Sequence, residues 1–258
     1  MNRSGAESDK RTAVEVTKDK NGIGRVLLRN PRGASARAIF KPPKAVRGGI
    51  PICFPQFGSR GLLEQHGFAR NKIWVIDENP PPLHPNDSNG KAYIDLLLKP
   101  SEENMKVWPH SFEFRLRVSL AEDGYLTMIS RIRNINCKPF SFSFAYRTYI
   151  SISDISEVRV EGLETFDYFD NLCDKERFTE QGDALTFESE VDRVYLSSSD
   201  VIAVLDHERK RTFTIRREGL PDVGVWNPWE KMSKSIADFG MRNTRGCFVL
   251  MEQQWRNQ

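Results

Sequence analysis

The chain has 258 residues, 28% of them charged, and its formal net charge is +3 at pH 7. The two signs of charge are interspersed and no basic stripe is interleaved with aromatic residues, so the sequence argues against nucleic-acid binding. No apolar run reaches transmembrane length and the first residues lack the apolar core of a signal peptide, so we expect a cytoplasmic protein that inserts into no membrane.

The cysteines lie far apart in the sequence, at Cys53, Cys137, Cys173 and Cys247. No two of them form a CxxC pair, which disfavours both a structural zinc site and a disulfide framework. We therefore expect a reducing compartment and no bound metal. No Ser/Gly-rich linker interrupts the chain, so a single domain is expected, since all-β domains often reach this size.

In chain order, residues 1–24 are polar and punctuated by glycine, so we expect a loose N-terminus with at most a short strand near Ala13–Thr17. The run RGGIPICFPQFGSRGLLEQHGFAR then occupies residues 47–70. Its glycines permit positive φ angles, and its prolines fix φ and remove backbone donors. This composition predicts a system of binding loops rather than a helix or a strand.

Four polar side chains of this run are candidates for ligand binding. Arg47 and Arg70 carry planar, permanently charged groups that suit a phosphate or a carboxylate gripped from two sides. Gln65 and His66 add neutral donors and acceptors of the kind that bind sugar hydroxyls. The alternative is that the run forms structural turns whose charges are solvated.

From residue 92 onward, apolar and polar residues mostly alternate, which is the pattern of half-buried antiparallel strands. Asp123-Gly124 predicts a hairpin turn, and a short helix is expected after Asn227-Pro228, with Asn as its cap. The expected strands cover residues 92–98, 112–120, 126–132, 140–150, 157–160, 201–205 and 212–216. The whole pattern predicts an all-β protein, a large antiparallel β-sandwich with long loops.

Several motifs together resemble the glucose-6-phosphate 1-epimerases, a branch of the galactose mutarotase superfamily. They are RGGIPICFPQFG, QHGFAR, FAYRTYISISDISEVRVEGLETFDYFDN and VWNPWEK, and the resemblance runs from about Val26 to Gly240. It implies a β-sandwich whose concave face binds a hexose 6-phosphate. It also implies interconversion of the α and β anomers of D-glucose 6-phosphate without a metal or an organic cofactor.

That reaction needs a base to take the proton from the anomeric hydroxyl and an acid to protonate the ring oxygen. The resemblance implies that Arg47 and Arg70 hold the phosphate and that Gln65 and His66 contact sugar oxygens. It further implies that Asp170, in DYFDN, accepts a hydrogen bond from a sugar hydroxyl. The alternatives are that Arg47 pairs with a carboxylate and that Asp170 caps a turn.

The first departure from the family pattern concerns the acid. The family carries this histidine in an HTY motif, and the chain has Arg147-Thr148-Tyr149 there. A guanidinium keeps its proton at neutral pH, so Arg147 cannot shuttle one, although it can stabilise negative charge on the ring oxygen. Losing a proton-transfer group typically costs about 10²–10⁴ in rate.

The second departure lies between Ala38 and Ile39, where strands that family members carry are missing. We therefore expect the sandwich to lack edge strands, which would expose pairing groups and apolar surface on the neighbouring strand. The expected organisation is a loose segment over residues 1–24, a mutarotase-like sandwich over 25–240 and an aberrant tail over 241–258.

The third departure is this tail, MRNTRGCFVLMEQQWRNQ, which shows neither strand alternation nor the family's ending. Its codons, read one base out of phase, can spell DEEYKRMFCVDGAAVEK, which resembles the family's C-terminal strand with its catalytic carboxylate. We hypothesise a frameshifted or misspliced ending. Glu252 lies one residue from the position of that base. It is either a substitute base, which needs a fixed geometry, or a solvated carboxylate on a disordered tail.

We expect a monomer whose ligand is a hexose 6-phosphate and whose epimerase activity is weak or lost, because both proton-transfer groups differ. The alternatives are a non-catalytic sugar-phosphate-binding protein, a degenerate family member that folds poorly, and a lectin-like module with an unrelated ligand. Turnover, ligand binding and a cooperative melt distinguish these hypotheses.

Overall fold

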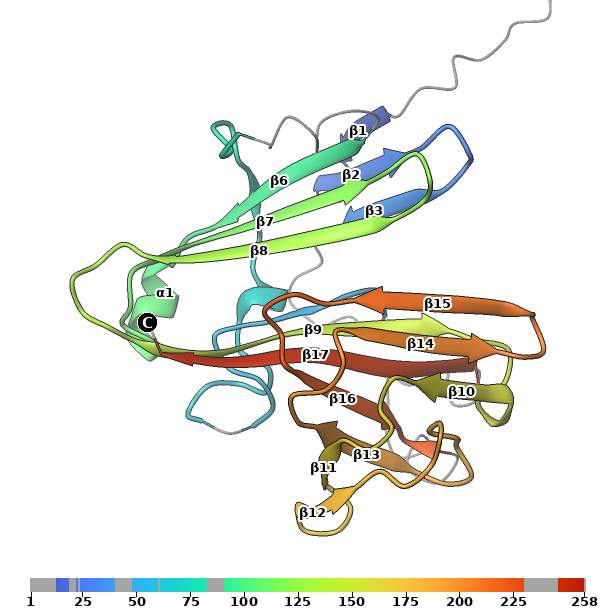
Figure 1. The fold of residues 1–258 in the computed structure, drawn as a ribbon. Helices are drawn as coiled ribbons and strands as arrows, with labels where there is room; N and C mark the ends of the chain where they lie inside the picture. The colour runs from blue at the N-terminus through green and yellow to red at the C-terminus, as the bar shows by residue number, and fades with distance from the viewer. Residues whose placement is uncertain are drawn as a thin grey trace, which may run out of the picture. The chain divides into compact units, whose positions relative to one another are not determined.

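The computed structural model describes residues 13–18, 22, 24–39, 48–59, 61–82, 91–229 and 246–257. Antiparallel strands in four sheets account for most of the regular structure of these residues (Figure 1). The all-β prediction is confirmed. No helix in the described part of the chain is both long and apolar enough to cross a membrane. The chain forms two compact units, residues 1–45 with 71–140 and residues 46–70 with 141–258.

The first unit contains a three-stranded and a four-stranded sheet. The former pairs β1 (Ala13–Lys18), β2 (Gly24–Arg29) and β3 (Ser35–Ile39); the latter has the order β5 (Val75–Ile76), β6 (Ala92–Leu98), β7 (Phe112–Leu120) and β8 (Leu126–Asn134). Strand β2 packs against β6 and β7 and buries Val26 and Leu28. One short helix, α1 (Glu102–Val107), begins at a capping box formed by Ser101 and Asn104.

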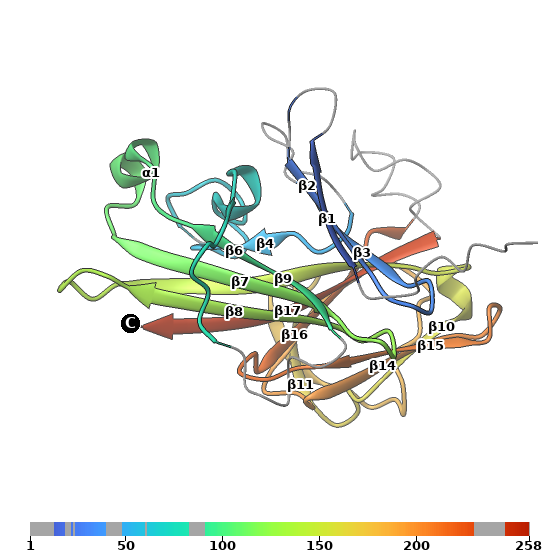
Figure 2. The same cartoon turned by 90° about the horizontal axis from the view of Figure 1, so that it is seen from above.

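The second unit contains a seven-stranded sheet and a three-stranded sheet. The seven-stranded sheet has the order β12 (Glu176–Thr179), β11 (Asp167–Asp170), β13 (Val191–Tyr195), β16 (Asp222–Asn227), β17 (Cys247–Asn257), β9 (Ser141–Ser151) and β4 (Ile52–Cys53). The smaller sheet has the order β10 (Val158–Glu161), β14 (Val201–Asp206) and β15 (Arg211–Arg216). Strands β9 and β17 run side by side along their whole length (Figure 2).

A large apolar cluster lies in the second unit, with members on β10, β14 and the seven-stranded sheet. Val223 and Val225 of β16 and Leu250 of β17 share one face of the seven-stranded sheet, because β16 and β17 pair in that register. They belong to one buried cluster with Ile202 and Val204 of β14. Burying each such side chain contributes about 1.5–3 kcal/mol. This face of the large sheet is therefore occupied by core, and its polar side chains belong to the opposite face or to buried networks.

The predicted strands over 92–98, 112–120, 126–132, 140–150, 157–160, 201–205 and 212–216 are confirmed to within a residue or two, as is the short strand at Ala13. The hairpin turn is also present, with Leu120 paired to Leu126 and Gly124 at φ +97°. The helix expected after Pro228 falls on residues that follow Trp229, and these lie outside the described part of the chain. Strands β2, β4, β5, β11, β12, β13, β16 and β17 are among those that were not predicted. The missing edge strands stay a prediction, since residues 40–47 lie outside the described part.

The prediction that the tail over 241–258 has no strand is wrong for residues 247–257, which form β17 between β16 and β9. The reason is physical: a strand buried on both faces shows a continuous apolar run instead of alternation. Phe248, Val249 and Leu250 are all fully buried. The frameshift hypothesis for the origin of this ending stays a prediction. Residues 247–257 of the tail form a central strand of the seven-stranded sheet.

Candidate functional site

The motif-rich run over residues 47–70 is anchored along β9, the strand that carries Arg147. Besides the β4 pairing, three β9 amides donate hydrogen bonds to carbonyls of the run, at 2.9–3.0 Å. The donor and acceptor pairs are Ser143 to Pro55, Arg147 to Pro51 and Tyr149 to Gly49. The run is otherwise irregular, as its glycines and prolines predict, apart from the 3-10 turn η1 (Ala69–Asn71). Arg47 itself lies outside the described residues.

His66 is held in a fixed orientation within this run. Its backbone N–H donates to the Gly58 carbonyl at 2.9 Å, and its Nδ1 accepts from the Gly58 N–H at 3.1 Å. The neutral ring therefore carries its proton on Nε2. His66 is buried, whereas Gln65 is exposed. The Gln65 carbonyl accepts a hydrogen bond from Arg70 Nη2 at 2.6 Å, which ties Arg70 to the same turn.

Gly67 is the backbone position on which this geometry depends. Its φ is +67°, and a Cβ there would lie 2.4 Å from the Phe54 carbonyl oxygen. Gly58 has nearly the same φ, +66°, with open space around it. Gly58→Ala should therefore cost about 1–2 kcal/mol of stability for the backbone conformation alone. Gly67→Ala should cost about 1–3 kcal/mol more, because a contact with backbone cannot relax cheaply. Urea denaturation measures both, and equal costs would contradict the clash.

Arg147 lies on the face of the seven-stranded sheet opposite the apolar cluster. Its guanidinium carbon is 5.0 Å from the ring centroid of Trp226 on β16 and 5.2 Å from that of Tyr149 on β9. Such contacts attract a cation to the ring faces. The side chain is only 8% exposed. A permanent positive charge is thus buried at this face, within contact of two aromatic rings.

Asp192 on β13 shares this face, because it pairs directly with Trp226. Its Oδ1 accepts a hydrogen bond from Asn171 Nδ2 at 2.8 Å. Burial raises the pKa of the Asp192 carboxyl, while the nearby Arg147 charge acts in the opposite direction. Asp192 was not predicted from the sequence. The signal for it is the alternation in VDRVY: Val191 and Tyr195 face the core, so Asp192 points to the opposite face.

Asp170 lies on the other face of the sheet. It pairs with Arg193, the immediate neighbour of Asp192, and successive residues of a strand point to opposite faces. Its Oδ1 accepts from the Leu172 N–H at 2.9 Å, and its Oδ2 lies 3.6 Å from Arg193 Nε. The structure thus agrees with the turn-capping alternative for Asp170 and does not bring this residue to the Arg147 face.

Glu252 is neither solvated nor on the Arg147 face. The register pairs Met251 with Arg147 and Gly224, and Glu252 with Tyr146 and Val223. Glu252 therefore points to the opposite face, where it is 5% exposed. Its Oε2 accepts from Thr148 Oγ1 at 3.3 Å, and burial raises its pKa to about 7. The expectation of a disordered, solvated carboxylate is wrong.

Arg70, the arginine of the predicted phosphate clamp that the structure describes, acts electrostatically on the same buried thiol as Arg147, that of Cys53. Burial raises the pKa of the Cys53 thiol to about 11, and the charges of Arg147 and Arg70 both act to lower it. Cys53 pairs with Ala145 on β9, two residues before Arg147. Arg147, Trp226 and Asp192 thus share one sheet face, whereas Arg70 and the buried His66 lie in the run over residues 47–70, which is anchored on β9 in the same unit.

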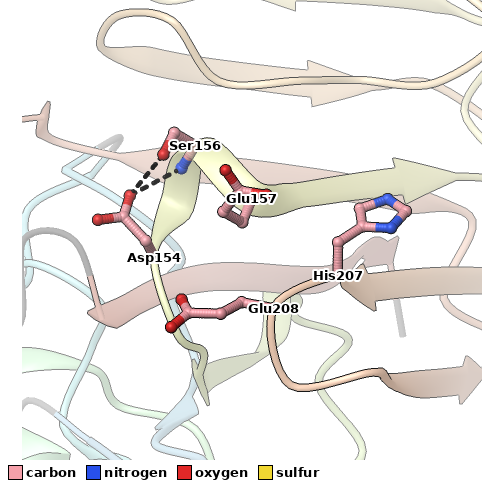
Figure 3. A pocket seen from close by; sticks show the side chains of 5 residues that line it. All are labelled: Asp154, Ser156, Glu157, His207 and Glu208. Atoms are coloured by element: carbon pink, nitrogen blue, oxygen red, sulfur yellow. Dashed lines mark hydrogen bonds between the residues drawn. The ribbon is translucent and has the colours of Figure 1, made fainter.

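A separate hollow lies at the end of η3 (Ile155–Glu157) and at the β14–β15 turn (Figure 3). It is lined by Asp154, Ser156, Glu157, His207 and Glu208. Asp154 Oδ1 accepts from the Ser156 N–H at 3.0 Å and from Ser156 Oγ at 2.8 Å, which caps the turn. Its carboxylates disfavour a phosphate. In the described ranges, no group of three His, Cys, Asp or Glu side chains is arranged to hold a metal ion.

Comparison with known proteins gives consistent matches over most of the chain. The family model of aldose 1-epimerase matches residues 15–254. A Cenchrus ciliaris protein provisionally named glucose-6-phosphate 1-epimerase is 62% identical over 228 residues, which cover 88% of this chain and 68% of that protein. A protein of Escherichia coli K12 with the same provisional name is 31% identical over 201 residues, which cover 77% of this chain and 64% of that protein. The chain thus spans about two thirds of the curated relatives it matches.

Solved structures share the fold. The crystal structure of a provisionally named mutarotase from Salmonella typhimurium superposes with a TM-score of 0.77 at 22% identity, covering 95% of this chain and 91% of that one. The Slr1438 protein from Synechocystis gives a TM-score of 0.65 at 19% identity, covering 100% and 96%. At these identities the likeness shows the fold alone.

Proposed function

The chain belongs to the aldose 1-epimerase family, as its motifs predict, and we propose that it binds D-glucose 6-phosphate and interconverts its α and β anomers slowly. The observation that carries this proposal is the placement of Arg147, Trp226 and Asp192 on one face of the seven-stranded sheet. That face offers a cation, an aromatic surface and a carboxylate to a single sugar ring. The names of the curated relatives support the same substrate.

In the proposed reaction, the Asp192 carboxylate takes the proton from the anomeric hydroxyl. As the C1–O5 bond opens, negative charge develops on the ring oxygen, and the Arg147 guanidinium stabilises it. Rotation about C1 and closure of the ring give the other anomer. Because Arg147 keeps its own proton, protonation of the ring oxygen depends on water, and we expect this step to limit the rate.

The loop over residues 47–70 supplies the rest of the proposed site. Arg70, and Arg47 by its motif, bind the 6-phosphate. His66 offers its Nε2–H to a sugar oxygen, since Nδ1 is occupied by Gly58. Gln65 is exposed beside Arg70 and contacts a hydroxyl from the rim. We propose no binding role for Asp170, which points to the other sheet face.

Asp192→Asn and Asp170→Asn form a matched pair that tests this proposal. Anomer-exchange NMR with glucose 6-phosphate measures the exchange rate above buffer, and phosphorus shifts in the same tube report binding. Asp192→Asn should lower the catalysed exchange by about 10²-fold or more, while the phosphorus shifts remain. Asp170→Asn should leave exchange unchanged and lower only stability.

Two outcomes contradict the proposal in different ways. Exchange at the buffer rate by the parent chain, with shifted phosphorus signals, makes this protein a non-catalytic sugar-phosphate binder. If exchange falls in Asp170→Asn and not in Asp192→Asn, the site lies on the sheet face that carries Asp170, opposite the proposed one.

A further inference from the structure

We propose that Gln56 is a positioning residue for ligand binding, whose side-chain amide holds the loop over residues 57–66 in the conformation that receives the sugar phosphate. The inference rests on the proposed function, because it assumes that this loop and Arg70 bind the ligand. Gln56 acts through the loop backbone, which in turn holds His66 and Arg70.

The backbone around Gln56 is fixed to β9, the strand that carries Arg147. The residues on either side of Gln56 both bond to Ser143 of β9. The Ser143 N–H donates to the Pro55 carbonyl at 3.0 Å, and the Phe57 N–H donates to Ser143 Oγ at 2.7 Å. Ser143 is buried and lies four residues before Arg147 on the same strand. The place of Gln56 along β9 is therefore well defined.

From this place the Gln56 side chain joins the two ends of the loop. Its Nε2 lies 3.1 Å from the Gly58 carbonyl oxygen and 3.3 Å from that of Leu63. Its Oε1 accepts a hydrogen bond from the Leu63 N–H, also at 3.3 Å. Gln56 is only 6% exposed, so water cannot readily replace these bonds. Removing the amide therefore removes a buried cross-link of the loop.

The same backbone groups hold the candidate ligand-binding side chains. The Gly58 carbonyl, which accepts from Gln56, also accepts from the His66 N–H at 2.9 Å. The Gly58 N–H donates to His66 Nδ1 at 3.1 Å. Further along the loop, the Gln65 carbonyl accepts from Arg70 Nη2 at 2.6 Å. A displacement of this backbone therefore moves both His66 and Arg70, and binding groups tolerate such misplacement poorly.

Gly61 gives independent access to the Gln56 amide. A Cβ added at Gly61 would lie 2.3 Å from Gln56 Oε1, and the three atoms nearest to it all belong to the Gln56 side chain. The φ of Gly61 is not in the left-handed region, so its backbone permits an alanine. Gly61→Ala therefore acts on the loop by displacing the Gln56 amide, and it removes no polar group.

A double-mutant cycle on the full chain tests the inference. Gln56→Ala and Gly61→Ala are made singly and together, and titration of the phosphorus shift measures the dissociation constant of glucose 6-phosphate for each. Each single variant should bind about tenfold more weakly than the parent, or worse. The double variant should bind no more weakly than Gln56→Ala, because the amide that Gly61→Ala displaces is already absent.

The rate of anomer exchange at saturating ligand separates positioning from chemistry. It should stay within about threefold of the parent rate in all three variants, because Arg147 and Asp192 lie on the sheet and not in the loop. Gln181→Ala is the matched control, since this exposed glutamine donates to one backbone carbonyl, that of Thr179. It should leave the affinity within about twofold of the parent value.

Three results would overturn the inference and leave the proposed function standing: unchanged affinity in Gln56→Ala, a lower saturated rate at unchanged affinity, or additive losses in the double variant. A parent chain that does not bind glucose 6-phosphate would overturn both. If the parent binds without exchange, only the proposed turnover fails, and the affinities decide the role of Gln56. If Gln56→Ala shows no cooperative melt, Gly61→Ala decides alone: weaker binding supports the inference and unchanged affinity overturns it.

Discussion

Arg147→His combined with Met251→Glu should raise the exchange of glucose 6-phosphate anomers by about 10²–10⁴-fold over the parent chain. The register places residue 251 directly opposite residue 147, on the same sheet face. A glutamate there would face the imidazole across the sheet surface, so that a base and an acid could both contact one sugar ring. A histidine exchanges protons near neutral pH, which a guanidinium does not. Exchange NMR measures the rate.

The space for this glutamate is already present. A Cβ added at Gly224 would lie 2.9 Å from Met251 Cε, so the methionine side chain extends over a residue that has none. Glutamate has a similar length and can occupy the same volume. Arg147→His with Met251→Gln is the matched control, because Gln keeps the shape without transferring a proton. It should reach only the rate of Arg147→His alone, in which Asp192 is the base.

Arg147→His alone should raise the rate by less than the double variant, because Asp192, the base of the proposed reaction, does not occupy the family position of that base. If this single variant reached the rate of the double variant, Asp192 would suffice as the base and a glutamate at position 251 would add nothing. If the double variant were no faster than its Gln control, residue 251 would not reach the ligand. Both results bear on the register of β17 against β9.

The sequence reveals the strands of this fold more readily than it reveals their faces. Alternation in 112–120 predicts β7 and the partner strand β8 correctly, because one face of each is more buried than the other. Strand β17 has no such contrast, since its central residues are buried on both faces. The loop over 47–70 could be predicted because glycine and proline act locally, through their own φ angles.

The faces depend on pairing partners distant in the chain. Asp170 and Glu252 point to the face opposite Arg147, whereas Asp192 and residue 251 share the Arg147 face. The sheet face of each residue depends on register, and a shift of one residue in register reverses it. The register of β17 is set by its contacts with β16 and β9, more than 90 residues away in the case of β9. No local pattern contains that information.

Replacing Glu252 by Gln should stabilise the protein by about 3 kcal/mol above pH 7. In the folded chain burial raises the pKa of Glu252 from its ordinary value of 4.5 to about 7, while the Thr148 hydroxyl and the Arg217 charge act in the opposite direction. The charged form is therefore disfavoured by folding. Gln keeps the hydrogen bond with Thr148 and carries no charge at any pH.

The direction of the pH dependence follows from the same shift. Between pH 4.5 and 7 the folded chain holds a proton on Glu252 that the unfolded chain has released. The contribution of this group to stability is thus fully favourable below pH 4.5, declines as the pH rises, and reaches its least favourable value above pH 7. Arg217 is also buried, but it is held by carbonyl and hydroxyl oxygens including Ser198, so it does not relieve the penalty completely.

Urea denaturation at pH 5 and pH 8 measures the effect. The difference in unfolding free energy between Glu252→Gln and the parent chain should be small at pH 5 and about 3 kcal/mol in favour of the variant at pH 8. Glu176→Gln on exposed β12 is the control and should change stability by no more than about 0.5 kcal/mol at either pH. A gain for Glu252→Gln that is equal at both pH values would mean that packing, not charge, limits the stability of β17. A loss at pH 8 would mean that the Glu252 carboxylate is paired in the folded chain, and that this central strand tolerates its charge.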